Sequence, residues 1–384
     1  MDFMLTEEQK LVQQTAREFA QTEVAKDAAQ RDQTEKFPVH HVKKMGELGF
    51  MGMMVDPQYD GGGLDTISYV LVMEELSKVD ASVGVICSVN NSLVCYGIEK
   101  YGSEFLKEKY LRPLARGDKL GAFCLSEPSS GSDASAMKTV AEKKGDMYIL
   151  NGTKNWITNG VNADYYVMTA MTDAAAGSHG ISAFVVEKGY LGFQVGKKEK
   201  KLGIRSSDTA SIILEDCQVP AENIIGEEGS GFKIAMTTLD GGRIGIAAQA
   251  LGIAQGAFEA AVRYAQERQQ FNRPIAKFQA IQFMLADMET RIDASRLLIF
   301  QAAWKKDQKQ NYSAESAKAK VFASETAVDV ATNAVQIFGG YGYLKDYPVE
   351  RFMRDSKITE IYEGTSEVQR LVIGRSLLKK YGTK

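Results

Sequence analysis

The stretch Ile361-Tyr362-Glu363-Gly364-Thr365 places a glutamate between an aromatic residue and a glycine. Such a carboxylate can remove a proton from carbon when it is desolvated, because burial raises the pKa of the carboxyl toward neutrality. Tyr362 can exclude water from it, and Gly364 lets a ligand approach the backbone closely. A surface glutamate in a turn would have the same local sequence, so this stretch by itself leaves both interpretations open.

A second segment rich in hydrogen-bond donors runs from Phe123 to Ala134, with the sequence FCLSEPSSGSDA. Small and hydroxyl residues around a glycine expose backbone N–H groups and side-chain donors to an anionic or heteroaromatic ligand. The alternative is a serine-rich surface loop without a ligand.

Trp156-Ile157-Thr158 is the third candidate. Its indole can lie against a flat ring, and the hydroxyl two residues along shares the same face of a strand. That hydroxyl could donate a hydrogen bond to a nitrogen of the ring. A tryptophan of the hydrophobic core is the alternative.

Three regions of the chain must position these residues, and the three differ in their residue patterns. Residues 1–117 are predicted to form an N-terminal helical domain, which opens with a capping box at Thr6 and Gln9. Residues 118–231 alternate short β-branched or aromatic segments with turn formers and are predicted to form a middle β domain. Residues 232–384 are alanine-rich, with a break at Pro274, and are predicted to form a C-terminal helical bundle.

The middle region predicts an antiparallel β-barrel or a sandwich, because its strands follow one another through turns without intervening helices. Asn151-Gly152 is expected to be a hairpin turn after Tyr148-Ile149-Leu150. Further strands are expected at residues 165–171, 181–187 and 210–219. The G-x-G-x-x-G fingerprint is absent from the sequence, which disfavours nicotinamide binding of the usual kind.

Composition narrows the class of protein. A chain of 384 residues is too long for one simple core, and a net charge of −3 gives no basic excess for nucleic acid. The four cysteines lack CxxC spacing and the three histidines lack metal-ligand spacing, so we expect reduced, buried thiols in a cytoplasmic protein and no metal site. No apolar run is expected to approach the ~20 residues that cross a bilayer, and the N-terminus resembles neither a signal peptide nor a transit sequence.

Six segments in order resemble the acyl-CoA dehydrogenase family over essentially the whole chain. They are FCLSEPSSGSD, WIT, LDGGR, residues 268–274, QIFGGYGY and IYEGTSE. The segment Ser88-Val89-Asn90-Asn91-Ser92-Leu93 makes the resemblance closest to the short-chain (butyryl-CoA) branch. The family resemblance implies an α+β multidomain chain with an N-terminal helical domain, a middle antiparallel β-barrel and a C-terminal helical bundle.

The resemblance also implies bound FAD, shared between two subunits. Phe123 to Ser132 would line the flavin and the acyl-CoA, with Leu125 and Ser126 near the isoalloxazine and Ser132 reaching the CoA side. Trp156 and Ile157 would pack at the flavin, and Thr158 would bond near its N5 edge. Segments that match those contacting a partner subunit's FAD in the family contribute Arg268, Gln270, Phe271, Gln279, Gln336, Ile337, Gly339 and Gly340. The last helix would begin near the dinucleotide, with Thr365, Ser366 and Glu367.

For the reaction, the resemblance implies that Glu363 is the catalytic base and that Gly364 lies beside the thioester. Asp240 and Arg243 would contact CoA, although a surface salt bridge would explain Arg243 equally well. Some relatives carry the base at the position before this arginine, which here is Gly242. The product would be a trans-2-enoyl-CoA.

Partners implied by the resemblance are an acyl-CoA, an electron-transfer flavoprotein and further copies of the chain as a dimer of dimers. A branched or cyclic short acyl-CoA is the nearest competing substrate. The same residues would also be compatible with an acyl-CoA oxidase or with an inactive flavin-binding scaffold.

Overall fold

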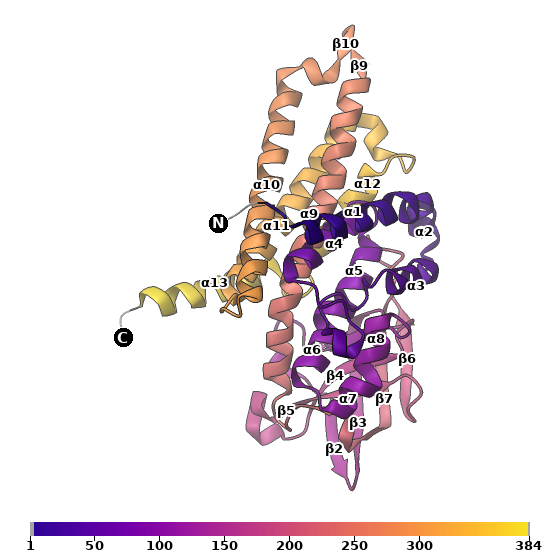
Figure 1. Ribbon diagram of the computed structural model, residues 1–384, viewed down its shortest axis with the longest axis vertical. Helices are drawn as coiled ribbons and strands as arrows, with labels where there is room; N and C mark the ends of the chain where they lie inside the picture. Colours follow the sequence, from indigo (N-terminus) through magenta and orange to yellow (C-terminus); the bar gives the residue numbers. More distant parts are fainter. Residues whose placement is uncertain (1–3, 383–384) are drawn as a thin grey trace.

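The computed structural model describes residues 4–382. The β domain occupies one end of the elongated molecule, and one long helix, α9, runs from it toward the opposite end (Figure 1). The N-terminal helices pack against the middle of α9, and α13 projects away from the body (Figure 1). The predicted order of a helical, a β and a second helical region is therefore confirmed.

The N-terminal region is mainly helical between Glu7 and Arg116, with one longer connection between Glu47 and Thr66 that contains the 3-10 turn Pro57–Tyr59. Its Thr6 accepts a hydrogen bond from Gln9 N and its backbone N–H donates to Gln9 Oε1, which confirms the capping box. The α-helices are α1 Glu7–Thr22, α2 Ala28–Thr34, α3 Val39–Glu47, α4 Thr66–Ser77, α5 Ala81–Ser88, α6 Tyr96–Tyr101, α7 Glu104–Leu106 and α8 Arg112–Arg116, with π-helical turns at Val89–Cys95 and Lys107–Leu111.

The continuous helical run Ala81–Tyr101 corrects one expectation. It is 21 residues long and apolar enough to cross a membrane by length and composition alone. Within the fold, 94% of its apolar window is buried, as in the core helix of a protein domain. Its side chains pack into the main hydrophobic core, where Val85, Ile86, Val94 and Ile98 are fully covered. The residues are hydrophobic because both faces of the helix are packed, which a sequence window does not reveal.

The middle region forms an eight-stranded mixed sheet in the order β6-β7-β3-β2-β4-β5-β8, with β1 also paired to β4. The strands are β1 Gly121–Cys124, β2 Val140–Lys144, β3 Met147–Thr158, β4 Tyr165–Met171, β5 Ile181–Glu187, β6 Phe193–Lys198, β7 Thr209–Pro220 and β8 Ile224–Ile225. The predicted strands at 165–171, 181–187 and 210–219 are thereby confirmed.

The predicted closed antiparallel barrel is wrong. β6 and β8 end the sheet without pairing to each other, so the described sheet is open. β1 and β2 both run parallel to β4, whereas the remaining pairs are antiparallel. Parallel pairing requires a long connection. The loop between β1 and β2 and the whole of β3 supply that length, and turn residues alone did not indicate it.

Asn151-Gly152 is not a hairpin turn. β3 continues through it, and the register with β7 shifts between Leu150 and Gly152, as in a β-bulge. The tight turn lies instead at Gly145, which has φ 65° and connects β2 to β3. A bulge and a type I′ turn both favour glycine after asparagine, so the dipeptide alone does not separate them.

The C-terminal region consists of α9 Gly231–Glu267, α10 Gln279–Asp307, α11 Ser313–Phe338, α12 Val349–Ser356 and α13 Ser366–Tyr381. A short hairpin, β9 Gln269–Gln270 and β10 Arg273–Pro274, joins α9 to α10. Pro274 is the last residue of this hairpin, which confirms the predicted break between two helices at Pro274. α9 is buried along most of its length because alanine and glycine let α4, α10 and α11 approach closely.

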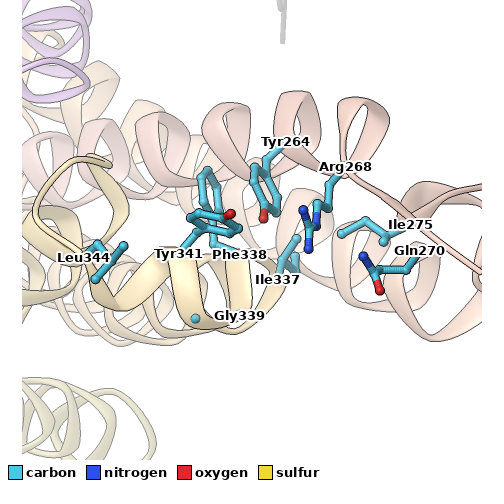
Figure 2. Close-up of a pocket in the computed structure, with 10 residues that line it drawn as sticks. Tyr264, Arg268, Gln270, Ile275, Ile337, Phe338, Gly339, Tyr341 and Leu344 are labelled. Atoms are coloured by element: carbon cyan, nitrogen blue, oxygen red, sulfur yellow. The ribbon is translucent and has the colours of Figure 1, made fainter.

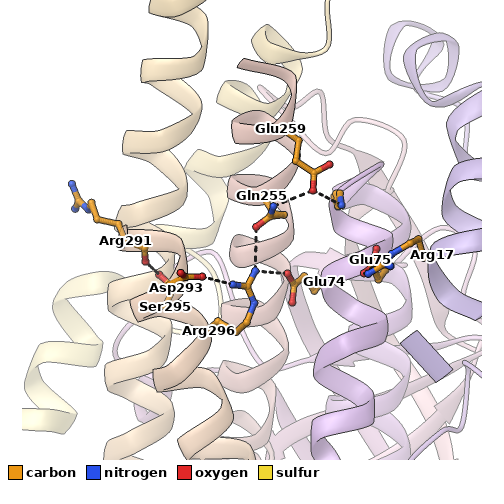
Figure 3. A network of polar contacts seen from close by, with 10 residues as sticks. Arg17, Glu74, Glu75, Gln255, Glu259, Arg291, Asp293, Ser295 and Arg296 are labelled. Carbon is orange, nitrogen blue, oxygen red and sulfur yellow. Dashed lines mark hydrogen bonds and ion pairs between the residues drawn. The ribbon is translucent and has the colours of Figure 1, made fainter. Parts of the chain in front are cut away.

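A network of polar contacts joins the two helical regions (Figure 3). Arg296 of α10 donates to Glu74 of α4 at 2.8 Å and to Gln255 of α9 at 3.1 Å. Arg17 of α1 pairs with the neighbouring Glu75 at 2.7 Å. Glu74 and Glu75 are buried, so these bonds fix how the N-terminal helices sit on α9.

Candidate active site

Glu363 lies in a left-handed turn immediately before α13. Its φ is 53° and that of Gly364 is 92°. A glutamate in this region of the backbone is uncommon and persists where surrounding contacts hold it. Three hydrogen bonds do so here: Gln369 Nε2 donates to Glu363 O at 3.2 Å and to Gly364 O at 2.9 Å, and Lys320 Nζ donates to Gly364 O at 2.7 Å.

The Glu363 carboxyl points inward. Within residues 4–382 its Oε2 is buried and has no hydrogen-bond partner, although other parts of Glu363 are partly exposed. Burial raises the pKa of this carboxyl to about 7, against the opposing attraction of Lys320 and Arg243. A carboxyl with this pKa is partly ionised at neutral pH and can accept a proton, as a general base requires.

Gly242 of α9 provides the space for this carboxyl. A Cβ added at Gly242 would lie 2.1 Å from Glu363 Oε2 and 2.7 Å from Leu93 Cδ2. Leu93 belongs to the π-helical turn Val89–Cys95, a distortion that often occurs at functional sites. The carboxyl therefore occupies a notch in α9 that exists because residue 242 has no side chain.

Arg243 and Asp240 lie beside the notch and form an ion pair. Asp240 also accepts from Ser313 Oγ at 3.0 Å. Arg243 is 6% exposed, so the alternative of a surface salt bridge is wrong. In the part of the chain that the structure describes, its Nε is buried and has no hydrogen-bond partner, which leaves one of its donors unsatisfied.

Aromatic and polar side chains close the inner side of the notch. The Tyr362 hydroxyl donates to Gln249 Oε1, and Gln249 Nε2 donates to Ala81 O at 2.8 Å. Tyr69 bonds to Ser88 at 2.9 Å, and its hydroxyl would lie 2.1 Å from a Cβ at Gly245. Burial raises the pKa values of Tyr69 and Tyr362, and their phenols lie close enough to Glu363 for its charge to raise these pKa values further.

Trp156 lies at the edge of the β domain in a bulge of β3. Its φ is 61°, and the register with β7 shifts between Lys154 and Ile157. The bulge turns the indole outward, so that Trp156 is 61% exposed while Ile157 is buried in the core of the domain. An exposed flat ring beside a bulge suits stacking against a planar ligand.

The serine-rich loop is anchored next to this tryptophan. Asn155 N donates to Ser126 O at 2.8 Å. Beneath the loop, Lys154 bonds to Glu127 at 2.8 Å and to Leu125 O at 3.3 Å. Glu127 also accepts from Lys138 N at 2.6 Å and Thr139 N at 3.0 Å, so one buried ion pair holds both ends of the loop.

A separate pocket of about 510 Å³ lies at the C-terminal end of α9, the end far from Gly242, and Figure 2 shows the residues that line it. Arg268, Gln270, Ile337, Gly339 and Gly340 line it, together with Tyr264, Phe338 and Tyr341. Tyr264 stacks on Phe338 with ring centroids 4.0 Å apart, and Arg268 lies over Tyr341 at 5.4 Å. Five of the predicted cofactor residues are thus brought together here.

Matches to three family models span nearly the whole chain. The acyl-CoA dehydrogenase N-terminal domain matches residues 6–118, the middle domain residues 122–217 and the C-terminal domain residues 229–378. The chain belongs to the acyl-CoA dehydrogenase family.

The short-chain specific acyl-CoA dehydrogenase of Clostridium acetobutylicum is 55% identical over 99% of this chain and 100% of its own length. Butyryl-CoA dehydrogenase from Megasphaera elsdenii superimposes with a TM-score of 0.97 at 50% identity, covering 98% of this chain and all of that one. A chain in the structure described as the electron transferring flavoprotein of Acidaminococcus fermentans matches with a TM-score of 0.98 at 56% identity, covering 99% of this chain and 100% of that chain.

For this acyl-CoA dehydrogenase, the predicted flavin residues fall into two groups separated by α9. Leu125 packs against Ala235 near the start of the helix, whereas Arg268 follows its last residue. α9 has 37 residues and therefore spans about 55 Å. Glu363 and its notch at Gly242 lie two turns beyond Ala235, on the side of the Leu125 group.

The remaining predicted residues divide in the same way. Ser132 is exposed at the serine-rich loop, and Thr158 is half-buried two residues after Trp156. Thr365 caps α13 by accepting from Val368 N at 3.3 Å, with Ser366 and Glu367 in the first turn. Phe271, Gln279 and Gln336 are exposed near the far pocket.

Two residues of the site were missed from the sequence. Lys320 is fully buried on α11, whose buried positions otherwise carry small or apolar side chains such as Ala317, Ala323 and Ser324. A lysine at the helical spacing of an apolar stripe was the available signal. Gln369 is also fully buried, but nothing in its local sequence marks it.

Proposed function

We propose that the protein is an FAD-dependent dehydrogenase that converts a short-chain acyl-CoA, such as butyryl-CoA, to its trans-2-enoyl-CoA. The observation that carries the proposal is the buried Glu363 carboxyl in the Gly242 notch, with an unpaired Oε2 and a pKa of about 7. The names of the relatives in Clostridium and Megasphaera support the short-chain substrate.

The residues of this chain fit FAD at both groups of predicted contacts. Trp156 presents an exposed ring and Ser126 lies in the adjoining loop, which suits a flavin ring. Arg268 and the Gly339-Gly340 backbone in the far pocket suit a pyrophosphate, which a guanidinium fork and close backbone approach favour. When bound, FAD supplies the redox chemistry by accepting the β-hydrogen and its electron pair as a hydride.

The chain itself handles the α-proton. The Glu363 carboxylate takes that proton as the Cα–H bond breaks, while the adjacent Cβ–H bond gives up its electron pair. Among the described residues the Glu363 backbone N–H has no acceptor, so it is free to donate to the thioester oxygen. A donor aimed at an oxygen that gains negative charge stabilises the transition state, commonly by several kcal/mol.

The separation of the two flavin groups supports a homo-oligomer. One FAD cannot reach both ends of a helix about 55 Å long. A second copy of the chain would bring its Arg268 pocket to the first copy's Trp156, which requires at least a dimer and is compatible with a dimer of dimers. The resemblance to a chain in an electron transferring flavoprotein structure supports such a flavoprotein as electron acceptor.

Anaerobic titration tests the reaction. Butyryl-CoA is expected to bleach the flavin absorbance of the wild type, and isobutyryl-, isovaleryl- and longer acyl-CoAs to do so less completely or more slowly. Glu363→Gln is expected to retain FAD and show no bleaching. A Glu363→Gln enzyme that still oxidises butyryl-CoA would remove Glu363 from the role of base.

Co-expression of two defective chains tests the shared site. Arg268→Met impairs the pocket given to a partner, and Glu363→Gln impairs the chain's own base. In a mixed dimer, one of the two sites combines an intact Glu363 with an intact Arg268, so activity should reappear. If each chain bound FAD alone, the mixture would stay inactive.

The domain limits at residues 117/118 and 231/232 stay a prediction. Limited proteolysis tests them: cleavage near Gly117 and near Gly229 would support both limits, whereas cleavage confined to loops within a domain would not.

A further inference from the structure

Lys320 is a buried cation that the reaction above leaves unused. It is fully buried on α11, and its Nζ donates to Gly364 O at 2.7 Å. Among the described residues it forms no ion pair with a carboxylate within 4.0 Å. Burying an ammonium without a paired carboxylate costs free energy, which suggests that Lys320 has a specific role.

Its position relates it directly to the candidate base. The carbonyl it holds belongs to the residue after Glu363, in the turn where both residues have positive φ. Gln369, the fourth residue of α13, also donates to this carbonyl, and it follows the turn in sequence whereas Lys320 precedes it. Lys320 and Gln369 therefore fix the turn that directs the carboxyl into the Gly242 notch.

Lys320 also faces the carboxyl electrostatically. The two cations that attract Glu363 are Lys320 and Arg243, but Arg243 is ion-paired with Asp240. Lys320 bonds to a neutral carbonyl instead, so its charge is less cancelled. The remaining ionisable groups that face either member are the phenols of Tyr362 and Tyr69 toward Glu363, and Glu360 and Glu367 toward Lys320.

We propose that Lys320 is the positioning residue of the base: its buried ammonium fixes the Glu363–Gly364 turn and is the counter-charge of the ionised Glu363 carboxylate. The proposal rests on the function proposed above for Glu363.

The sign of the electrostatic effect follows from the two groups. Burial lowers the pKa of Lys320 to about 8 and raises that of Glu363 to about 7. Between these values the carboxylate and the ammonium coexist, and each favours the charged form of the other. Removing the cation disfavours the carboxylate, so the pH at which the base becomes active should rise by about one unit or more.

The test measures the base without electron transfer. Acetyl-CoA has α-hydrogens but no β-hydrogen, so deuterium uptake from D₂O, followed by mass spectrometry, reports α-proton removal alone. The holoenzyme is assayed from pH 5.5 to 9 as wild type, Lys320→Met, Lys320→Gln and Lys320→Arg. Lys318→Met, on the same helix and without a hydrogen bond to the turn, is the matched control.

Lys320→Met and Lys320→Gln should move the midpoint of deuterium uptake up by about one pH unit, which is about a tenfold loss at pH 6. Lys320→Arg keeps the charge and should keep the wild-type midpoint at a lower rate, and Lys318→Met should match the wild type. FAD absorbance and thermal unfolding report whether each variant is folded. If Lys320→Met does not fold, the comparison is made between Lys320→Gln, which retains a hydrogen-bond donor but no charge, and Lys320→Arg, which retains both.

A midpoint in folded Lys320→Gln that equals the wild-type midpoint would overturn the proposal, as would a lower unfolding temperature with an unchanged pH dependence. A wild-type enzyme that neither exchanges deuterium nor oxidises butyryl-CoA would instead overturn the proposed function. The two failures are therefore distinguishable.

Discussion

Gly242→Ala is the sharpest test of the site geometry. The new Cβ would lie 2.1 Å from Glu363 Oε2, whereas ordinary van der Waals contact begins at 3.4 Å. The carboxyl must therefore move by about 1 Å, because its far end is more mobile than the α9 backbone. Leu93 Cδ2, at 2.7 Å from the same position, must also yield.

A displacement of about 1 Å at a reacting group can cost about 100-fold in rate. We therefore expect kcat/KM for butyryl-CoA to fall by roughly 100-fold in Gly242→Ala. The fold should survive, since alanine in a helix is favoured over glycine by about 1 kcal/mol and this offsets part of the clash.

Gly241→Ala is the matched control in the same helix. A Cβ at Gly241 would meet nothing closer than Lys306 Nζ and Tyr312 Oη, both at 3.8 Å. This variant should keep wild-type kcat/KM and unfold at a slightly higher temperature. Steady-state kinetics and thermal unfolding of both variants check the reasoning. Gly242→Ala with more than a third of the wild-type kcat/KM would refute the placement of the carboxyl in the notch.

Four further outcomes are expected. kcat/KM should rise with pH through about 7 as Glu363 ionises. The pKa of Glu363 in the folded protein lies above its ordinary value of 4.5, so this group destabilises the fold increasingly as the pH rises from 4.5 to about 7, and fully above that pH. Glu363→Gln should therefore unfold at a higher temperature than wild type at pH 8 but not at pH 4.5. Lys154→Met leaves the buried Glu127 carboxylate without its cation, although two backbone N–H groups still donate to it, and should cost roughly 3–5 kcal/mol in denaturant unfolding. Lys144→Met, in a surface pair, should cost about 0–1 kcal/mol, and equal costs would contradict the buried pairing. Arg268→Met should lose FAD during gel filtration while Arg263→Met retains it, and equal retention would remove Arg268 from the cofactor site.

Sequence patterns predicted the elements whose signals are local. The capping box at Thr6, the strands at 165–171 and 181–187 and the break at Pro274 all depend on neighbouring residues. The burial of Glu363 could not be predicted locally, because it depends on Gly242 being 121 positions earlier in the chain and facing it across the fold.

The open topology of the sheet was also missed because it depends on contacts between residues far apart in the sequence. Whether a sheet closes depends on the pairing of its first and last strands, and here β6 and β8 stay apart while β1 and β2 pair in parallel with β4. Turn residues report which strands follow one another but not which strands meet. Lys320 lies at the spacing of the apolar stripe of α11, but its burial also depends on the elements that pack on this helix, which the spacing alone does not give.

The length of α9 has a consequence for the supply of cofactor. If the two ends of this helix serve different FAD molecules, a single chain offers only half a binding site, and FAD affinity is a property of the assembly. Ligand binding and association are then linked by mass action: dilution of the protein promotes loss of FAD, and scarcity of FAD promotes dissociation. Retained cofactor, measured against protein concentration, would then follow a steep rather than a flat curve.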